Sequence, residues 1–357
     1  IDLKDVIEGN QYDDVISRTR SDFDPHYIGN SELSRCGLLL PHTNESVVQI
    51  PYRAIVPRKI DGLLFSGRGI SQTHNALQFT RMSKDVKMLG YVTGRIASEI
   101  SINKITNNRY DVSKLQKELV KTGFLPASNP KQEDDTVQSK VSKLIKGENG
   151  YLFKCCLLPK AKIVPVLLKE FKSTENLNLA KALAWFSEPI GISIIISELE
   201  QLINEEKNTE NRESFIDKYN PESLYWRINQ NIGFLAMSGD KNSKDTILNI
   251  LNNTGSGGGP VTYLADNLYN SQRIDLRLIP YHNRITNICF YIERLPDPIF
   301  INGLERLLED KNIKGFKTTE YHRTRWRIYG ADLELYLAAV LARCGAKTGF
   351  NLLIDYL

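Results

Sequence analysis

The residues best suited to hold a ligand lie between Leu63 and Lys84. The apolar run Leu63-Leu-Phe65 lacks polar alternation, so it predicts a strand that is buried on both faces. Gly67 and Arg68 follow this run. A glycine lets the backbone approach a bound molecule closely, and a guanidinium supplies fixed hydrogen-bond donors. The segment therefore predicts a turn in contact with a ligand.

A predicted helix begins beside this turn, at Lys84, and continues to Ile102. Its apolar residues recur at helical spacing, and Gly90 and Gly94 lie one turn apart, which predicts a flat side for close packing. The amino end of a helix carries a partial positive charge, and Arg81 lies just before this end. The sequence thus predicts a positively charged helix start near the glycine turn.

Two glycine-rich segments partly match known phosphate-binding motifs, but neither match is complete. Gly62-x4-Gly67-Arg68-Gly69 has arginine in place of the P-loop lysine and lacks the hydroxyl that holds magnesium. Residues 255–260 follow no predicted strand, and Pro260 stands where the dinucleotide fingerprint has its last glycine. The sequence therefore holds no complete Rossmann phosphate loop.

Histidines offer acid–base groups at two places. His26 in Asp24-Pro-His26 is either a substrate-side acid or base, or a polar loop residue. His74 is either part of a ligand loop or a histidine satisfied within its own loop. His282 lies among basic residues that include Arg284, and this pattern favours a solvated helix face over an anion site.

Residues 51–94 carry a series of short motifs in a fixed order. They are Pro51-Tyr-Arg-Ala-Ile-Val-Pro57, Asp61-Gly-Leu-Leu-Phe-Ser-Gly-Arg68, Ile70-Ser-x-Thr-His-x-Ala76, Arg81-Met82, Gly90 and Gly94. This order and spacing resembles the C-terminal end of the FAD-dependent oxidoreductase family, which is related to fumarate-reductase-type flavoproteins. The resemblance covers about residues 1–125, roughly a third of the chain.

The resemblance implies a site for FAD. Gly67 and Arg68 would lie against its ribityl or phosphate part, and the helix from Lys84 would point its positive end at the flavin pyrimidine. Met82 would lie beside the ring. The implied cofactor-binding residues are Gly67, Arg68, Ala76, Arg81, Met82 and Lys84. The predicted catalytic residues are Arg81, His74 and His26.

The sequence also departs from the family pattern. Where the family has Arg-Val-Met-Pro-Thr, this chain has Arg81-Met-Ser-Lys-Asp85, and Tyr91 replaces a small polar residue. The family's glycine-rich βαβ unit lies N-terminal to the matching motifs. The chain begins at Ile1, which we interpret as mid-chain sequence of a longer parent. We therefore expect FAD in the intact parent but little or no retention of FAD by residues 1–357.

The second half of the sequence predicts paired helices. Residues 127–150 have linker composition, and short turns centred at 188, 239, 296 and 345 then recur after 51, 57 and 49 residues. An apolar helix is predicted before and after each turn. Helical hairpins at such a period suggest a HEAT-like α-solenoid over residues 151–357.

Composition excludes several classes of protein. Lys plus Arg number 46 and Asp plus Glu 42, a net charge of +4 that we take as spread along the chain, so a nucleic-acid partner is disfavoured. Five cysteines without CxxC spacing predict neither a disulfide scaffold nor a metal site. No apolar run is long enough for a membrane span, and no signal segment opens the chain. The compartment stays undetermined.

These observations predict an α/β piece of a flavin domain at residues 1–126, a linker at 127–150 and an all-α repeat domain at 151–357. The predicted function is hydride transfer between a small-molecule substrate and FAD in the parent protein. The helical repeats would then bind a protein partner or cover the substrate site. The alternative is a non-catalytic helical-repeat binding module with a degenerate flavin-domain remnant.

Overall fold

The computed structural model describes most of the chain. The described residues are 1–21, 46–127, 136–148, 150–208, 223–254, 278–310 and 325–356. The chain divides into two compact units, residues 1–163 and residues 164–357, and the division falls inside a helix. Each unit is described separately below.

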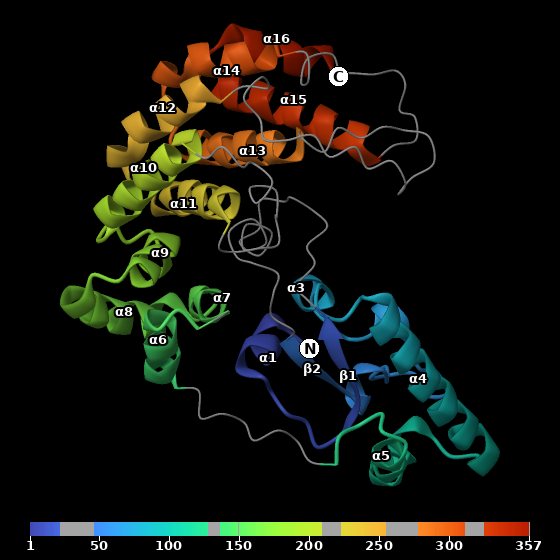
Figure 1. The fold of residues 1–357 in the computed structure, drawn as a ribbon. Helices are drawn as coiled ribbons and strands as arrows, with labels where there is room; N and C mark the ends of the chain where they lie inside the picture. Colours follow the sequence, from blue (N-terminus) through green and yellow to red (C-terminus); the bar gives the residue numbers. More distant parts are fainter. Residues whose placement is uncertain are drawn as a thin grey trace. The chain divides into compact units, whose positions relative to one another are not determined.

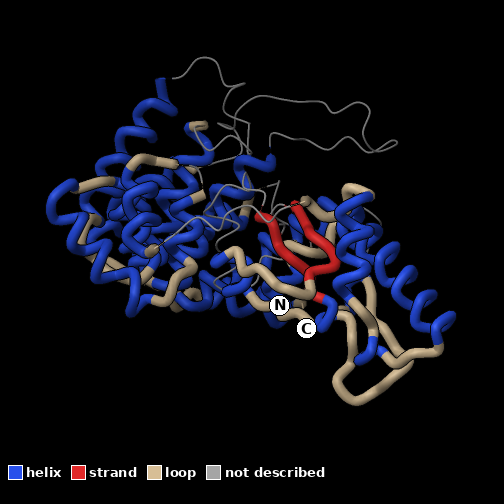
Figure 2. The backbone as a smooth tube through the Cα atoms, turned by 90° about the horizontal axis from the view of Figure 1, so that it is seen from below, coloured by secondary structure: helices blue, strands red, loops and turns tan. Residues whose placement is uncertain are grey.

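The first unit contains a two-stranded antiparallel sheet (Figure 2). Strands β1 (Val15–Ser21) and β2 (Ser46–Pro51) pair, with Thr19 opposite Val48 and an irregularity between Val15 and Ser17. The other elements are α1 (Leu3–Glu8), η1 (Tyr52–Ala54), η2 (Gly67–Gly69), α3 (His74–Leu77), α4 (Ser83–Asn103), η3 (Asn107–Arg109), α5 (Val112–Lys121), α6 (Val137–Ile145) and α7 (Tyr151–Cys156).

Helix α4 closes the core of this unit over the sheet. Leu89, Val92 and Ile96 follow one another at helical spacing, and each side chain is at most 1% exposed. They share a buried cluster with residues of both strands and of α5. The predicted helix from Lys84 to Ile102 is confirmed, and it ends at Lys104 in the left-handed conformation.

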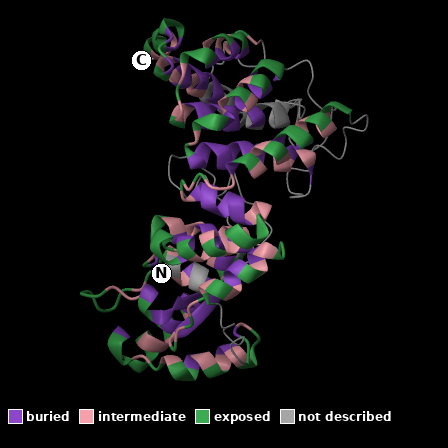
Figure 3. Cartoon of the chain, turned by 90° about the vertical axis from the view of Figure 1, so that its left-hand side faces the viewer, coloured by how far each residue is buried: buried purple, intermediate pink, exposed green. Residues whose placement is uncertain are grey.

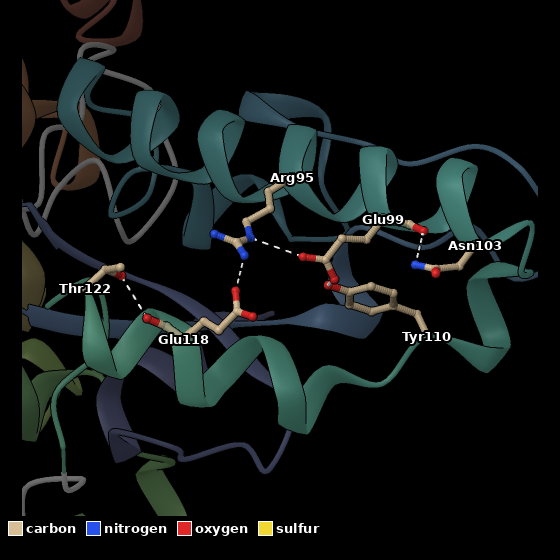
Figure 4. Close-up of polar contacts among 6 residues, drawn as sticks. All are labelled: Arg95, Glu99, Asn103, Tyr110, Glu118 and Thr122. Atoms are coloured by element: carbon tan, nitrogen blue, oxygen red, sulfur yellow. Dashed lines mark hydrogen bonds and ion pairs between the residues drawn. The ribbon is translucent and has the colours of Figure 1, made fainter.

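A polar network fastens α5 to α4 (Figure 4). Arg95 on α4 forms ion pairs with Glu99 on the same helix and with Glu118 on α5. The hydroxyl of Tyr110 donates a hydrogen bond to the second oxygen of Glu99 at 2.9 Å. Burial and the bond to Glu99 raise the pKa of Tyr110 above its usual value, so the phenol stays protonated. The network lies along one side of α4 and leaves the amino end of that helix open.

Two expectations for this unit are wrong. The run Leu63-Leu-Phe65 forms no strand, and Leu63 and Phe65 are each 42% exposed. The described sheet pairs only β1 with β2, so nothing in it covers this run. Gly90 and Gly94 are exposed, because α4 buries the face of Leu89 instead.

Part of the predicted linker is ordered structure. Helix α6 lies within residues 127–150, with Val141 and Leu144 fully buried, and it packs on α7. Thr136 caps α6, accepting a hydrogen bond from the backbone of Ser139. The helix forms because Val137, Val141 and Leu144 lie on one face at helical spacing, although most of the surrounding sequence is polar.

The second unit is helical throughout its described residues (Figure 1). Its helices are α8 (Lys160–Thr174, which begins in the first unit), α9 (Leu177–Trp185), α10 (Ile192–Asn208), α11 (Leu224–Ser238), α12 (Lys244–Asn253), α13 (Leu278–Arg294), α14 (Ile301–Leu308), α15 (Arg325–Arg343) and α16 (Lys347–Asp355), with short η5 (Lys241–Ser243) and η7 (Pro298–Phe300). Every helix predicted beside the four turns overlaps one of these. The sequence therefore correctly predicts the helices that flank the four turns.

Contacts in this unit follow a regular order. Helices α9, α11, α13 and α15 contact each other in succession, and α10, α12, α14 and α16 contact members of that row or one another. Figure 3 shows buried residues gathered where the helices face each other. Arg284 of α13 is only 9% exposed and bonds to Asn229 and Glu206, so the predicted solvated face is wrong at this residue.

Among the described residues, no helix has the length and apolar character needed to cross a membrane. The same residues contain no cluster of His, Cys, Asp and Glu arranged for a metal ion. Four cysteines in the described part are free thiols, and all four are buried.

Candidate functional site

The glycine turn packs directly on α4. Gly67 opens η2 with φ of +64°, and η2 contacts α4. A Cβ added at Gly67 would meet no atom within 4 Å, so open space lies in front of this backbone. A Cβ added at Gly90 of α4 would lie 3.9 Å from Ser66 Oγ, which shows how closely the turn approaches the helix. Arg68 is exposed at the centre of the turn.

The amino end of α4 has no side-chain cap. Met82 occupies the capping position, and its side chain has no acceptor for the first backbone N–H groups. The Met82 carbonyl accepts from Asp85 and Val86, whereas the N–H groups of Ser83 and Lys84 have no partner within the described part of the chain. Two N–H donors therefore point out of a 21-residue helix, while the buried carboxylate of Asp85 in its first turn offsets part of the helix dipole.

Basic side chains surround this helix end. Lys84 Nζ donates a hydrogen bond to the carbonyl of Arg20 at 2.9 Å, which ties the first turn of α4 to the end of β1. Arg18 on the same strand is 9% exposed, and burial together with Arg20 lowers its pKa. Arg81 is half-buried just before the helix. The region is suited to a ligand that carries negative charge or carbonyl oxygens.

Hydrogen bonds within the loop and from Ile1 hold the loop that carries His74. Thr73 caps the short helix α3 by accepting from the backbone of Ala76, and Thr80 Oγ1 donates to Gln72 Oε1 at 2.5 Å. Ile1 pairs with the same loop: its backbone nitrogen donates to the Ser71 carbonyl, and its carbonyl accepts from the Thr73 N–H, both at 2.9 Å. The loop thus has a fixed backbone.

The predicted site residues fall into three groups according to their place in the structure. Gly67 and Arg68 lie in a turn packed on α4, and Arg81, Met82 and Lys84 lie at the start of that helix. His74 is exposed in the braced loop, whereas Ala76 beside it is fully buried and offers a ligand no side-chain surface. His26 lies outside the described residues.

Sequence reasoning missed two features of this site. One is the uncapped start at Met82, for which the signal was a residue without a side-chain acceptor at a helix boundary. The other is the pairing of Ile1 with residues 71–73, which no local pattern reveals because the partners are 70 positions apart.

Comparison with known proteins bears on the first unit. The family described as FAD dependent oxidoreductase matches residues 1–119, a third of the chain. No curated protein matches, and no solved structure matches. The match therefore confirms the resemblance of the N-terminal region to this family, which the motifs at residues 51–94 indicated.

Proposed function

We propose that residues 1–119 form part of a FAD site, with the flavin end of the cofactor between η2 and the start of α4. The observation that carries this proposal is the uncapped helix start next to an open glycine turn. The flavin pyrimidine has carbonyl oxygens that can accept from the free N–H groups of Ser83 and Lys84. The open space at Gly67 lets a bound molecule lie directly on the backbone.

The residues at the start of α4 would hold the flavin of FAD, which would supply hydride-transfer chemistry and whose reduced form carries negative charge on the pyrimidine. The chain's own contribution is to stabilise that charge. Arg81 and the dipole of α4 supply positive potential without any rearrangement, which favours the charged state over the neutral one. Lys84 adds to the same potential while its bond to Arg20 holds the helix end in place. His74, exposed in a fixed loop, is our candidate for proton transfer at the flavin edge.

The other end of FAD has no visible counterpart in this sequence. Neither glycine-rich segment forms a complete phosphate loop, so the adenosine diphosphate part gains few contacts from these residues. We therefore expect residues 1–357 to recognise the flavin half alone and to bind it weakly.

The test uses FMN as the probe and the full chain as the protein. FMN is titrated against residues 1–357, and its fluorescence is followed for the unchanged chain, Arg68→Ala and Arg58→Ala. Arg58 is also exposed and lies ten residues earlier, so it is a matched control. Arg68→Ala should raise the Kd about fivefold or more, the loss of one charge-assisted hydrogen bond, whereas Arg58→Ala should leave it within about twofold.

A competition with ADP completes the experiment. ADP should displace little FMN, because the proposed site holds the flavin half. Equal effects of the two arginine variants, or displacement of FMN by equimolar ADP, would show that the flavin does not lie against η2.

We also propose that the helical half is an α-solenoid that serves as a binding module. Side chains about one repeat apart bond to each other: Ser187 to the Met237 carbonyl over 50 positions, and Lys181 to Gln230 over 49. Arg343 and Glu293, also 50 positions apart, form an ion pair. These separations match the turn period of 49 to 57 residues read from the sequence. This repetition favours the alternative function, in which the helical half is a non-catalytic binding module.

A further inference from the structure

Six lysines lie on or directly beside α6, α7 and the start of α8, and the proposed flavin site does not use them. Residues 137–163 contain six lysines and one glutamate, a net charge of +5. Of the 46 Lys or Arg and 42 Asp or Glu in the chain, 40 and 41 lie elsewhere, a net charge of −1. The segment therefore carries more positive charge than its share of the net charge of the chain.

Two of these lysines are held against one aromatic ring. The Nζ atoms of Lys143 and Lys154 lie 4.9 and 4.5 Å from the centroid of the Tyr151 ring. Lys143 Nζ also donates a hydrogen bond to the Tyr151 hydroxyl at 2.8 Å. Cation–π attraction holds both ammonium groups at the ring in spite of their mutual repulsion. The pair is thus ordered before any partner arrives, which lowers the entropic cost of binding.

The other lysines extend this charge over the surface. Lys146, Lys160 and Lys162 are exposed. In the described part of the chain, no carboxylate forms an ion pair with Lys146, Lys154 or Lys162. Glu148 is exposed in the same segment, and the lysines outnumber it. Such an excess of like charge attracts an anionic partner over about a Debye length, roughly 8 to 10 Å.

We infer that this surface docks an acidic segment of a partner protein. We call it the lysine face; it consists of Lys143, Lys146, Lys154, Lys160 and Lys162. Its cations are all lysines, and residues 137–163 contain no arginine, the residue preferred for paired contacts to phosphates. No large apolar side chain is exposed among the described residues of this segment, whereas a membrane-binding face presents such side chains to the lipid. Carboxylates therefore suit the face better than nucleic acid or a bilayer.

The test measures binding of a fluorescein-labelled polyglutamate peptide by anisotropy at low salt. The variant Lys146→Gln, Lys154→Gln, Lys162→Gln removes three charges from the lysine face. The control Lys114→Gln, Lys117→Gln, Lys121→Gln removes three exposed charges from α5, so both variants have the same net charge. The first should raise the Kd about tenfold, and the control should raise it less than about threefold. Circular dichroism checks that both remain folded.

Two further probes decide between partner classes. Duplex DNA of equal charge and phosphatidylserine vesicles should bind more weakly than the peptide. The inference is overturned by no measurable binding of the peptide, by equal losses in the two variants, or by tighter binding of either competing probe. No flavin takes part, so these outcomes are independent of the FAD proposal.

Discussion

At Gly67 the backbone adopts φ of +64°, a conformation that side chains with a Cβ disfavour. Gly62, five residues earlier, has φ of +73°, and a Cβ at either position would meet no atom within 4 Å. The two glycines thus share one backbone constraint and differ in their place in the fold. Only Gly67 lies in the turn that packs on α4.

This pair gives a prediction at the scale of one residue. Gly67→Ala and Gly62→Ala should each lower the free energy of unfolding by about 1 kcal/mol, because both force an alanine into the left-handed region. Only Gly67→Ala should also weaken FMN binding, since its methyl group would occupy the proposed ligand space. Urea unfolding and FMN titration measure the two effects. Equal FMN affinity of both variants would contradict the placement of the flavin.

At the scale of elements, ion pairs connect successive helical pairs of the second unit. Lys244 at the start of α12 bonds to Asp297, which caps η7 ahead of α14. The bond from Lys244, followed by the backbone N–H of Ile299, holds the pKa of Asp297 below its usual value of 3.8. A carboxyl whose pKa is depressed by folding stabilises the protein above its unfolded pKa, and this contribution disappears as the pH falls through its folded pKa.

The stability of this connection should therefore depend on pH. Lys244→Met should be less stable than the unchanged chain at pH 7 and pH 5, and the gap should shrink as the pH falls below about 4. Lys172→Met, which removes an exposed lysine of α8, should show no such pH-dependent gap. Urea unfolding at pH 7, 5 and 3 measures both. A gap that stays constant down to pH 3 would mean that Asp297 is not the partner that matters.

At the scale of the whole molecule, the buried cluster of β1, β2, α4 and α5 runs from Val15 to Leu125 and includes no later residue. The main contacts of the helices from α6 onward are with one another, such as α6 with α7 and α9 with α11. One ring pair, Phe79 and Phe153 with centroids 6.4 Å apart, does connect α7 to the loop after α3. Most of the burial on each side of residues 128–135 is therefore local.

Residues 136–357 should accordingly fold without residues 1–127, at a modest cost for the lost Phe79 contact. A shorter fragment, residues 136–310, lacks α15 and α16 and should still unfold cooperatively but at a lower temperature, because a stacked array loses only the interface of its last pair. Thermal circular dichroism measures both fragments. An unfolded 136–357 fragment would argue for one merged domain, and an unfolded 136–310 fragment alone would argue against nearest-neighbour stacking.

Much of this architecture could be predicted from local sequence. In the helix from Lys84 and in the paired helices after residue 160, apolar residues recur at helical spacing. This pattern can be read within each segment alone, without knowledge of distant residues. The motifs at residues 51–94 indicated the family that matches residues 1–119. The prediction of a buried strand at Leu63-Leu-Phe65 was wrong. A run of apolar residues favours burial, but it does not show that a neighbouring strand is present to pair with it.

The sequence by itself indicated the helix from Lys84, the paired helices after residue 160, the family that matches residues 1–119 and the chemical types at the candidate site. Only the tertiary structure decided that Gly67 lies against α4, that the start of α4 is uncapped, and that Lys143 and Lys154 share the ring of Tyr151. The physical reason is the distance along the chain over which each property is set. Periodicity and motif spacing are set by near neighbours along the chain, whereas exposure, unpaired donors and charge density depend on segments that folding brings together or leaves apart.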